Sequence, residues 1–253
     1  MFIDTHCHLS REDYNDIDLV INNNRAVGVS SIIISGCTKD SIIESIELTK
    51  KYKDVYATIG YHPSECNITN SSDINELRKQ LSEDKIVGVG EIGLDYHYGK
   101  EDIETQKELF RTQLMIAEDM NLPVVIHSRD ATKDTIDILK EYKVKGIIHC
   151  FSGSLETARE YISMGFLLGT GGVVTFKNSN LGNVVKEIGL PNIVLETDSP
   201  YLAPTPYRGE QNSSKYIPII AERIAEILNV LPEDVEKITT KNAVSLFDLN
   251  INL

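Results

Sequence analysis

Two histidines, His6 and His8, stand two residues apart at the end of the short apolar run that begins the sequence. In a strand, residues two apart share one face, so both imidazoles project to the same side while Cys7 points to the other. Two imidazoles on one face can hold a metal ion. A strand end whose histidines are satisfied by hydrogen bonds has the same pattern, so the assignment depends on further ligands.

Polar residues also follow several other β-rich runs. Five of the six histidines come directly after such a run, and the sixth, His97, follows Glu91 by six residues. The polar segments are 4–8, 60–63, 90–95, 127–130, 149–153 and 196–200. Chance placement would scatter histidines through the helical segments as well. A shared site is the economical explanation.

Four imidazoles with several carboxylates are too many ligands for one tetrahedral ion, but they suit two divalent ions joined by a carboxylate. Glu91 is the best candidate for that bridge, because it follows the glycine-rich segment 87–90, which lets metals or neighbouring strands approach closely. The alternative role for Glu91 is a buried partner of a cation such as Arg129.

Two acidic residues near the last strand, Glu196 and Asp198, have the same parity and are expected to face inward. We interpret Asp198 as a metal ligand that also accepts a proton from water. Glu196 lies one layer deeper and would orient ligands or water, and a purely structural role fits it equally well. Asp4 shares the parity of His6 and His8, and a structural role is favoured for it.

Eight β-rich runs alternate with amphipathic segments along the sequence. The predicted strands are 1–5, 31–35, 55–59, 86–90, 123–126, 146–148, 166–169 and 193–195. The predicted helices between them are 17–27, 41–52, 74–81, 104–120, 132–142, 155–164 and 181–188. Regular alternation of this kind indicates parallel strands with crossover helices.

Eight such units in 253 residues predict an α/β protein with a single (β/α)8 TIM barrel as one domain over residues 1–253. Segments 216–228, 232–239 and 242–247 are expected to be extra C-terminal helices. The alternative is an open, doubly wound sheet, but the glycine-rich dinucleotide turn is absent after the first strand. Residues 7–10 read Cys-His-Leu-Ser there.

The net charge of −13 disfavours proteins that coat long nucleic acids, because these present a broad basic face. Phosphate would therefore have to be bound at a compact cationic site, and metal ions are one source of that charge. The four cysteines are widely spaced and are read as reduced thiols. No signal segment or run of membrane-spanning length is recognised, so we expect a cytoplasmic protein without membrane contact.

Taken together, these motifs resemble the TatD family of metal-dependent hydrolases in the amidohydrolase superfamily. The motifs that carry the resemblance are Asp4-Thr5-His6-Cys7-His8-Leu9, Gly60-Tyr61-His62-Pro63, Gly90-Glu91-Ile92-Gly93-Leu94-Asp95-Tyr96, Ile126-His127-Ser128-Arg129-Asp130-Ala131, His149-Cys150-Phe151-Ser152-Gly153, Glu196-Thr197-Asp198-Ser199-Pro200-Tyr201-Leu202-Ala203-Pro204, Arg208-Gly209 and Thr239-Thr240-Lys241-Asn242-Ala243. They run nearly from end to end of the sequence.

The resemblance implies a (β/α)8 barrel with two divalent ions and deoxyribonuclease activity on DNA ends, of the 3′ to 5′ exonuclease type. The implied ligands are His6, His8 and Asp198 for one ion, His127 and His149 for the other, and Glu91 for both. Related amidohydrolases bridge their ions with a modified lysine on the fourth strand, whereas this sequence has Glu91.

A mechanism follows from these parts, with a water activated between two ions and Asp198 as its proton acceptor. His62 and Arg129 are expected to contact phosphate. Arg208 is a further candidate for phosphate binding, with a solvated loop position as the alternative. Tyr61, Tyr96, Phe151 and Tyr201 flank the motifs and suit either base stacking or buried packing.

Two other classes of protein remain compatible with the same ligands. One is a metal-dependent deacylase or amidase, for example one acting on aminoacyl-tRNA, and the other is a barrel that binds metal without catalysis. The metal can be zinc, manganese, cobalt or nickel, and magnesium prefers more oxygen ligands. DNA ends are the expected partner, and no obligate protein partner is indicated.

Overall fold

The structure, a computed structural model, describes residues 1–99 and 101–251. In this part of the chain, eight parallel strands alternate with helices and follow their chain order in the sheet, as in a (β/α)8 barrel. The strands are β1 (Phe2–Cys7), β2 (Val29–Gly36), β3 (Val55–Ile59), β4 (Ile86–Asp95), β5 (Val124–Arg129), β6 (Gly146–Ile148), β7 (Leu167–Thr170) and β8 (Ile193–Leu195).

Four of the described helices begin at a side-chain cap. Asp16, Thr38, Asn70 and Ser154 each accept a hydrogen bond from a backbone N–H of the helix that follows them. The helices are α1 (Ile17–Ala26), α2 (Lys39–Lys51), α3 (Ser71–Gln80), α4 (Ile103–Met120), α5 (Thr132–Leu139), α6 (Leu155–Ser163), α7 (Leu181–Ile188), α8 (Ile217–Leu228) and α9 (Pro232–Phe247). Short 3-10 turns are η1 (Pro63–Glu65), η2 (Gly172–Thr175), η3 (Leu190–Asn192) and η4 (Ser214–Tyr216).

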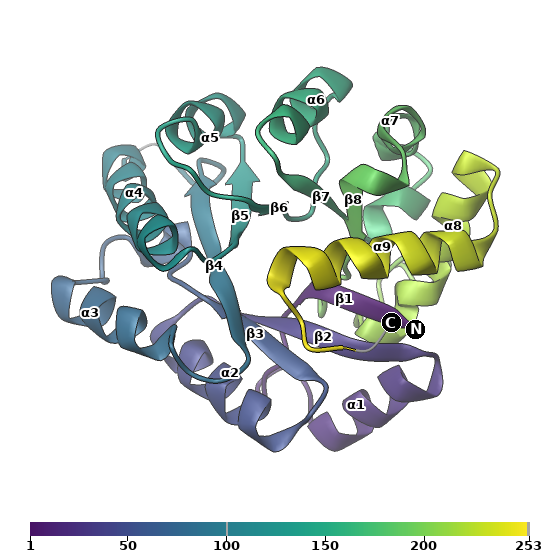
Figure 1. Cartoon of the computed structure of the whole chain (residues 1–253), viewed down its shortest axis with the longest axis horizontal. Helices are drawn as coiled ribbons and strands as arrows, with labels where there is room; N and C mark the ends of the chain where they lie inside the picture. The colour runs from purple at the N-terminus through teal and green to yellow at the C-terminus, as the bar shows by residue number, and fades with distance from the viewer. Residues whose placement is uncertain (100, 252–253) are drawn as a thin grey trace. The chain divides into compact units, whose positions relative to one another are not determined.

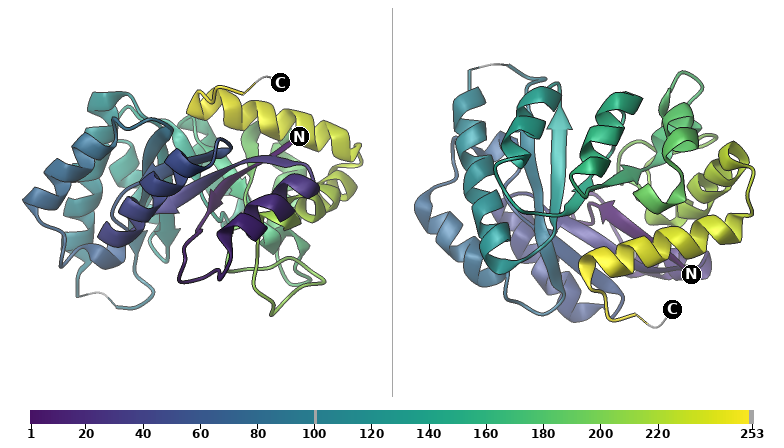
Figure 2. Two further views of the ribbon diagram at one scale, coloured as in Figure 1. Left: turned by 90° about the horizontal axis from the view of Figure 1, so that it is seen from below. Right: turned by 45° about the horizontal axis from the view of Figure 1, so that its top comes forward.

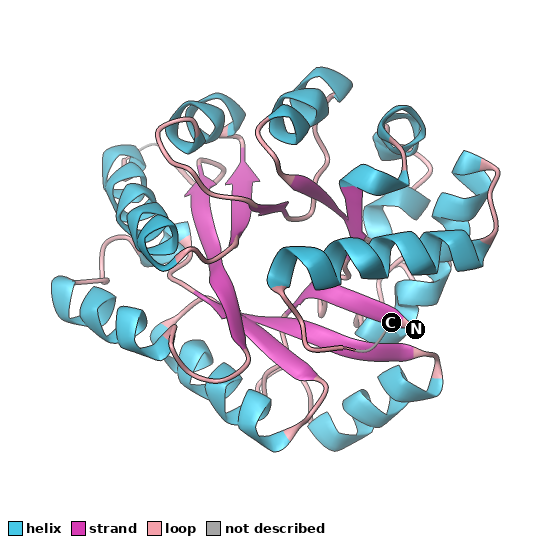
Figure 3. Ribbon diagram, in the orientation of Figure 1, coloured by secondary structure: helices cyan, strands magenta, loops and turns pink. Residues whose placement is uncertain are grey.

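The chain divides into two compact units. Unit 1 consists of Met1–Ile34 and His149–Leu253, and unit 2 of Ser35–Ile148. In unit 2, β4 pairs with β3 on one side and with β5 on the other, and β5 pairs with β6. Helices α3, α4 and α5 line one face of these strands (Figures 1 and 3). The fully buried Phe110 and Leu114 of α4 contribute to the core there.

In unit 1, β1 pairs with β2 and β7 pairs with β8. Helix α9 lies beside β1 in the views of Figures 1 and 2. Hydrogen bonds fix it there, because the Thr240 hydroxyl donates to the Met1 carbonyl at 2.8 Å. The Asn242 amide donates to the carbonyl of Leu190 at 2.9 Å, at the start of η3, and to that of Ile193 at 2.8 Å, at the start of β8. The motif that contains Asn242 therefore has a structural role.

The predicted break between helices 232–239 and 242–247 is wrong, since α9 continues through it. The two predicted helices leave out Thr240 and Lys241, and threonine side chains can compete for backbone groups in a helix interior. In the structure the Thr239 hydroxyl donates to the Val235 carbonyl within the helix. The Thr240 hydroxyl leaves the helix to bind Met1, so neither threonine interrupts it. Strand β4 also runs to Asp95, beyond the predicted end at residue 90.

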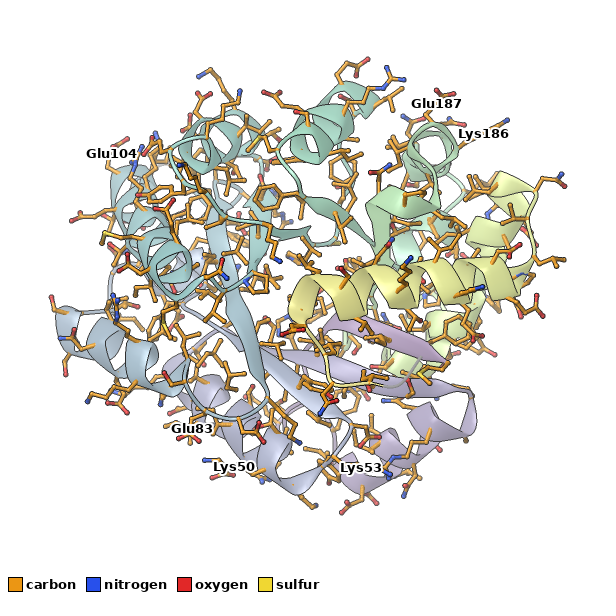
Figure 4. All side chains as sticks on the ribbon, viewed as in Figure 1. Lys50, Lys53, Glu83, Glu104, Lys186 and Glu187 are labelled. Carbon is orange, nitrogen blue, oxygen red and sulfur yellow. The ribbon has the colours of Figure 1, made fainter. Side chains whose placement is uncertain are left out.

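Charged side chains occupy the outer faces of the helices, where Figure 4 labels Glu104, Lys186 and Glu187. Some form exposed ion pairs, such as Lys50 with Glu83 at 2.9 Å. Pairs of this kind contribute about 0–1 kcal/mol each to stability. Among the described helices, none combines the length and apolar character needed to cross a bilayer.

The structural role of Asn242 gives a direct prediction for stability. In Asn242→Ala the buried carbonyls of Leu190 and Ile193 lose their side-chain donor, which we expect to lower the free energy of unfolding by about 1–3 kcal/mol. Urea denaturation measures this loss. Asn183→Ala is the matched control, because Asn183 is exposed and its amide bonds within its own helix segment. Equal losses in the two variants would contradict the assignment.

Candidate metal centre

In unit 1, the end of β1 is joined to the loop that follows β8. The His6 carbonyl accepts from the Asp198 amide at 3.0 Å, and the His8 amide donates to the Ser199 carbonyl at 2.7 Å. These backbone bonds hold the two histidines of β1 and the carboxylate of Asp198 at the same end of neighbouring segments. The predicted shared orientation of His6 and His8 is confirmed by their side chains, because both Nε2 atoms lie within 3.6 Å of Asp198 Oδ1.

The side chains of these residues converge on one carboxylate oxygen. Asp198 Oδ1 lies 3.6 Å from His6 Nε2 and 3.5 Å from His8 Nε2. The His6 ring also stacks on the His149 ring, with centroids 4.1 Å apart. His6, His149 and Asp198 each offer a ligand atom within 4.8 Å of one another. We call His6, His8, His149 and Asp198 the unit 1 cluster.

The donor set of the unit 1 cluster fits a divalent ion. Two nitrogen or oxygen ligands of one such ion, each about 2.1 Å from the metal, lie roughly 3–3.5 Å apart. The separations between Asp198 Oδ1 and the two imidazoles are close to this spacing. Neutral imidazoles and a carboxylate are also the ligand types that zinc and its neighbours accept. This cluster can bind a metal.

Electrostatics in the unit 1 cluster favour an ionised Asp198. Burial raises the pKa of its carboxyl, but contact with the imidazoles of His6 and His8 outweighs burial and holds that pKa well below its usual range. Asp198 and Cys150, which follows His149, both have positive φ angles, of 51° and 47°. Non-glycine residues adopt this conformation rarely and often at functional sites.

Two further carboxyls lie beneath this cluster and are completely buried. Asp4 accepts hydrogen bonds from the Thr197 hydroxyl at 2.6 Å and the Thr197 amide at 3.1 Å, so it fixes the loop that carries Asp198. Glu196 accepts a bond from the Cys150 amide and lies against Gly169, where a Cβ atom would overlap its Oε2. Burial raises the pKa of Asp4 to about 6 and that of Glu196 to about 8.

In unit 2, a second cluster forms where β4 and β5 run side by side. His127 Nδ1 lies 2.7 Å from Glu91 Oε1, and His127 Nε2 lies 3.2 Å from Asp95 Oδ2. His62 Nε2 is 4.0 Å from Glu91 Oε1, and its ring meets the His127 ring edge to face at 4.6 Å. We call Glu91, Asp95, His127 and His62 the unit 2 cluster.

The unit 2 cluster favours a cation. Burial lowers the pKa of His127, but the carboxylates of Asp95 and Glu91 outweigh this and raise it to about 9. A positive charge is thus stabilised between the two carboxylates. When one nitrogen of an imidazole binds a metal, the other commonly donates to a carboxylate. Asp95 can hold His127 Nε2 in this way, which leaves His127 Nδ1 and Glu91 as neighbouring candidate ligands.

Asp95 was not singled out from the sequence as a functional residue. A signal was present, because Asp95 is four residues after Glu91 in β4, so both side chains project from the same face. Burial raises the pKa of Asp95, but its contacts with His127 and with the His97 amide outweigh burial and lower it below the usual range. Asp95 is therefore an ionised partner of His127.

The predicted phosphate contacts have different surroundings. His62 accepts from the Ser64 amide at Nδ1, so its Nε2 faces Glu91. Arg129 is exposed, and its guanidinium lies over the Tyr98 ring, 5.3 Å from the centroid. Arg208 is exposed too and stacks on Phe176 at 3.7 Å. His62 thus belongs to the unit 2 cluster, whereas the guanidinium groups of Arg129 and Arg208 each stack on an aromatic ring.

Among the aromatic candidates, Tyr61 and Phe151 are buried, and Tyr96 donates its hydroxyl to Asp134 at 2.8 Å. These three residues have packing roles. Tyr201 is 60% exposed and its ring lies 6.3 Å from that of His8, so it stays available for base stacking. The bridging role predicted for Glu91 stays a prediction.

The chain matches the family model described as TatD related DNase over residues 3–248. It is 42% identical to the uncharacterized metal-dependent hydrolase YabD of Bacillus subtilis (strain 168), with 99% of this chain and 100% of that protein covered. It is 35% identical to the uncharacterized metal-dependent hydrolase YcfH of Escherichia coli (strain K12), with 98% and 96% covered.

Solved structures agree with these relatives. The crystal structure of YJJV, a TatD homologue from Escherichia coli K12, superposes with a TM-score of 0.91 at 28% identity and covers 98% of each chain. The TatD family hydrolase of Entamoeba histolytica gives a TM-score of 0.87 at 25% identity, with 97% of each chain covered. The predicted (β/α)8 fold is confirmed. This chain belongs to the TatD family of metal-dependent hydrolases.

Proposed function

We propose that this protein is a divalent-metal-dependent deoxyribonuclease that hydrolyses phosphodiester bonds at single-stranded or frayed DNA ends. The observation that carries the proposal is the donor set around Asp198, where one carboxylate oxygen faces two imidazoles at the spacing of metal ligands. The family description, TatD related DNase, supports DNA as the substrate class. Removal of nucleotides from the 3′ end rests on the family resemblance, and the cytoplasmic location stays a prediction.

The proposal includes two divalent ions per chain. His6, His8 and Asp198 would hold one, and His127 would hold the other. The sequence-based assignment of His149 to the second ion, and of Glu91 to both, is part of the proposal. The mixed nitrogen and oxygen donors suit zinc, manganese, cobalt or nickel better than magnesium.

The chemistry divides between the ions and the chain. Bound divalent ions lower the pKa of water and stabilise negative charge on phosphate oxygens. Asp198 accepts the proton of the attacking water, and we assign this step to Oδ2 because Oδ1 is the oxygen beside both imidazoles. Glu196 is a positioning residue, since it is buried and holds the Cys150 amide next to His149.

Phosphate binding would fall to His62, Arg129 and Arg208. The guanidinium groups of Arg129 and Arg208 are exposed and present planar donors that match phosphate oxygens. Their stacking on Tyr98 and Phe176 restricts their orientation. His62 Nε2 lies 4.0 Å from Glu91 Oε1, and His62 would contact the scissile phosphate.

Specificity for ends follows from burial and charge. The side chain of His6 is fully buried, and those of His127 and Asp198 are 16% exposed, so the scissile phosphate has to reach recessed ligands. A flexible single strand can reach them more easily than a stiff duplex. The net charge of −13 adds a penalty for laying a long polyanion over the surface.

The role of Asp198 predicts a specific kinetic change. At saturating Mn²⁺, Asp198→Asn should lower kcat on a short single-stranded oligonucleotide by about 10²- to 10⁴-fold, because the proton acceptor is lost, while KM changes little. Asp119→Asn, at an exposed position on α4, is the matched control and should keep wild-type kinetics. A raised KM with an unchanged kcat would contradict the role of Asp198.

The specificity for ends predicts different fates for two forms of one substrate. A linear single-stranded oligonucleotide should be degraded, whereas its covalently closed circle should resist under the same metal conditions, because a circle has no end. Gel analysis over time measures both. Equal degradation of both forms would point instead to an endonuclease. Hydrolysis of a charged tRNA without cleavage of either DNA would favour the deacylase alternative.

A further inference from the structure

Two glutamines of α4, Gln106 and Gln113, are buried in unit 2 although they belong to no predicted motif. They are 9% and 0% exposed. Seven residues make nearly two helical turns, so both side chains project from the same face of α4. Burying a primary amide is unfavourable unless its polar atoms are paired. Their partners therefore show what these amides do.

Each glutamine binds both backbone groups of a single residue. Gln113 Oε1 accepts from the Tyr61 amide at 2.7 Å, and its Nε2 donates to the Tyr61 carbonyl at 2.9 Å. Gln106 Oε1 accepts from the Asp95 amide at 2.9 Å, and its Nε2 donates to the Asp95 carbonyl at 2.9 Å. A side-chain amide has the same donor and acceptor as a peptide group. Each glutamine therefore makes the pair of hydrogen bonds that a neighbouring strand would otherwise make.

The arrangement of the strands in unit 2 explains why the backbone groups of Asp95 and Tyr61 need side-chain partners. β3 ends at Ile59, opposite Val89, so β4 continues through residues 90–95 beyond its partner. The Tyr96 amide donates to the Arg129 carbonyl on the β5 side, which directs the backbone groups of Asp95 to the opposite edge. Gln106 satisfies them there.

The same reasoning applies to the segment that follows β3. The amides of Gly60 and His62 donate to the carbonyls of Gly36 and Cys37, so the groups of Tyr61 between them point to the other edge. Gln113 satisfies those groups. Gly60 allows this approach, because a Cβ atom there would lie 2.6 Å from Ile92 Cγ2 and 3.2 Å from Gln113 Oε1.

Both clamped residues lead directly to the unit 2 cluster. Asp95 itself contacts His127 Nε2 at 3.2 Å, and Tyr61 precedes His62, whose ring meets that of His127. We propose that Gln106 and Gln113 are positioning residues that hold Asp95 and His62 in register with His127 and thereby set the affinity of the unit 2 cluster for a divalent ion. The inference rests on the proposed ion at this cluster and is independent of the substrate.

Methionine variants test the proposal, because methionine has a similar length and removes both hydrogen bonds. Zn²⁺ is titrated into ¹⁵N-labelled protein, and the imidazole signals of His127 report binding in unit 2. We expect Gln106→Met and Gln113→Met each to weaken Zn²⁺ binding at His127 by about 10-fold or more. The signals of His6 report the unit 1 cluster in the same spectra and should titrate as in the wild type. Gln80→Met, at a half-buried position on α3, is the control.

Thermal unfolding of the same variants separates positioning from general stability. A lower Tm with unchanged Zn²⁺ affinity at His127 would overturn the proposal. Absence of any Zn²⁺ response at His127 in the wild type would reject the proposed ion, and the inference with it. If Gln113→Met does not fold, the proposal is tested with Gln106→Met and with hydrogen exchange of backbone amides in the wild type. The Tyr61 and Asp95 amides should then exchange as slowly as that of Ile126 in β5, and rapid exchange would contradict the clamps.

Discussion

Charge compensation between buried carboxylates and imidazoles is the constraint on which both clusters depend. Asp198 lies between His6 and His8, and His127 lies between Glu91 and Asp95. Buried charges are costly unless an opposite charge or hydrogen bonds accompany them. The contacts lower the pKa of Asp198 and raise that of His127, so each cluster keeps its ionised groups by pairing them. A divalent ion bound at either cluster, as proposed, would add positive charge beside the same carboxylates.

Backbone hydrogen bonds also hold the residues of the two clusters in place. The candidate ligands lie near the carboxyl ends of strands, where the regular ladder stops on at least one side and leaves backbone groups in need of partners. In unit 1 the segment after β8 binds the end of β1 directly. In unit 2 the side chains of α4 supply the missing partners. The positions of the candidate ligands thus depend on the hydrogen bonds that satisfy the backbone groups at these strand ends.

The strands and most of the candidate ligands could be predicted from the sequence, for a physical reason. Alternating β-rich and amphipathic segments locate the strands, and metal ligands cluster at strand ends, so motifs at those ends identify candidate ligands. The pairing of His6 and His8 with Asp198, and of His127 with Glu91, agrees with that reasoning. The family comparisons agree with the motif-based resemblance.

Other features depend on tertiary structure and leave little trace in the sequence. The position of α9 beside β1 depends on contacts such as the bond from Thr240 to Met1, which joins residues far apart in the chain. The length of β4 depends on its pairing with β5, which continues to Asp95 opposite Arg129. A buried glutamine on an amphipathic helix looks like any polar residue until its backbone partner is known, so Gln106 and Gln113 could not be assigned from the pattern alone.

The central claim is that both clusters bind divalent ions, and anomalous diffraction from crystals soaked with Mn²⁺ tests it most directly. The account predicts one strong anomalous peak within ligand distance of His6, His8 and Asp198, and another beside Glu91 and His127. Crystals soaked with the metal and a chelator provide the control. Absence of a peak at either cluster, while Mn²⁺ is bound at surface carboxylates, would contradict the account.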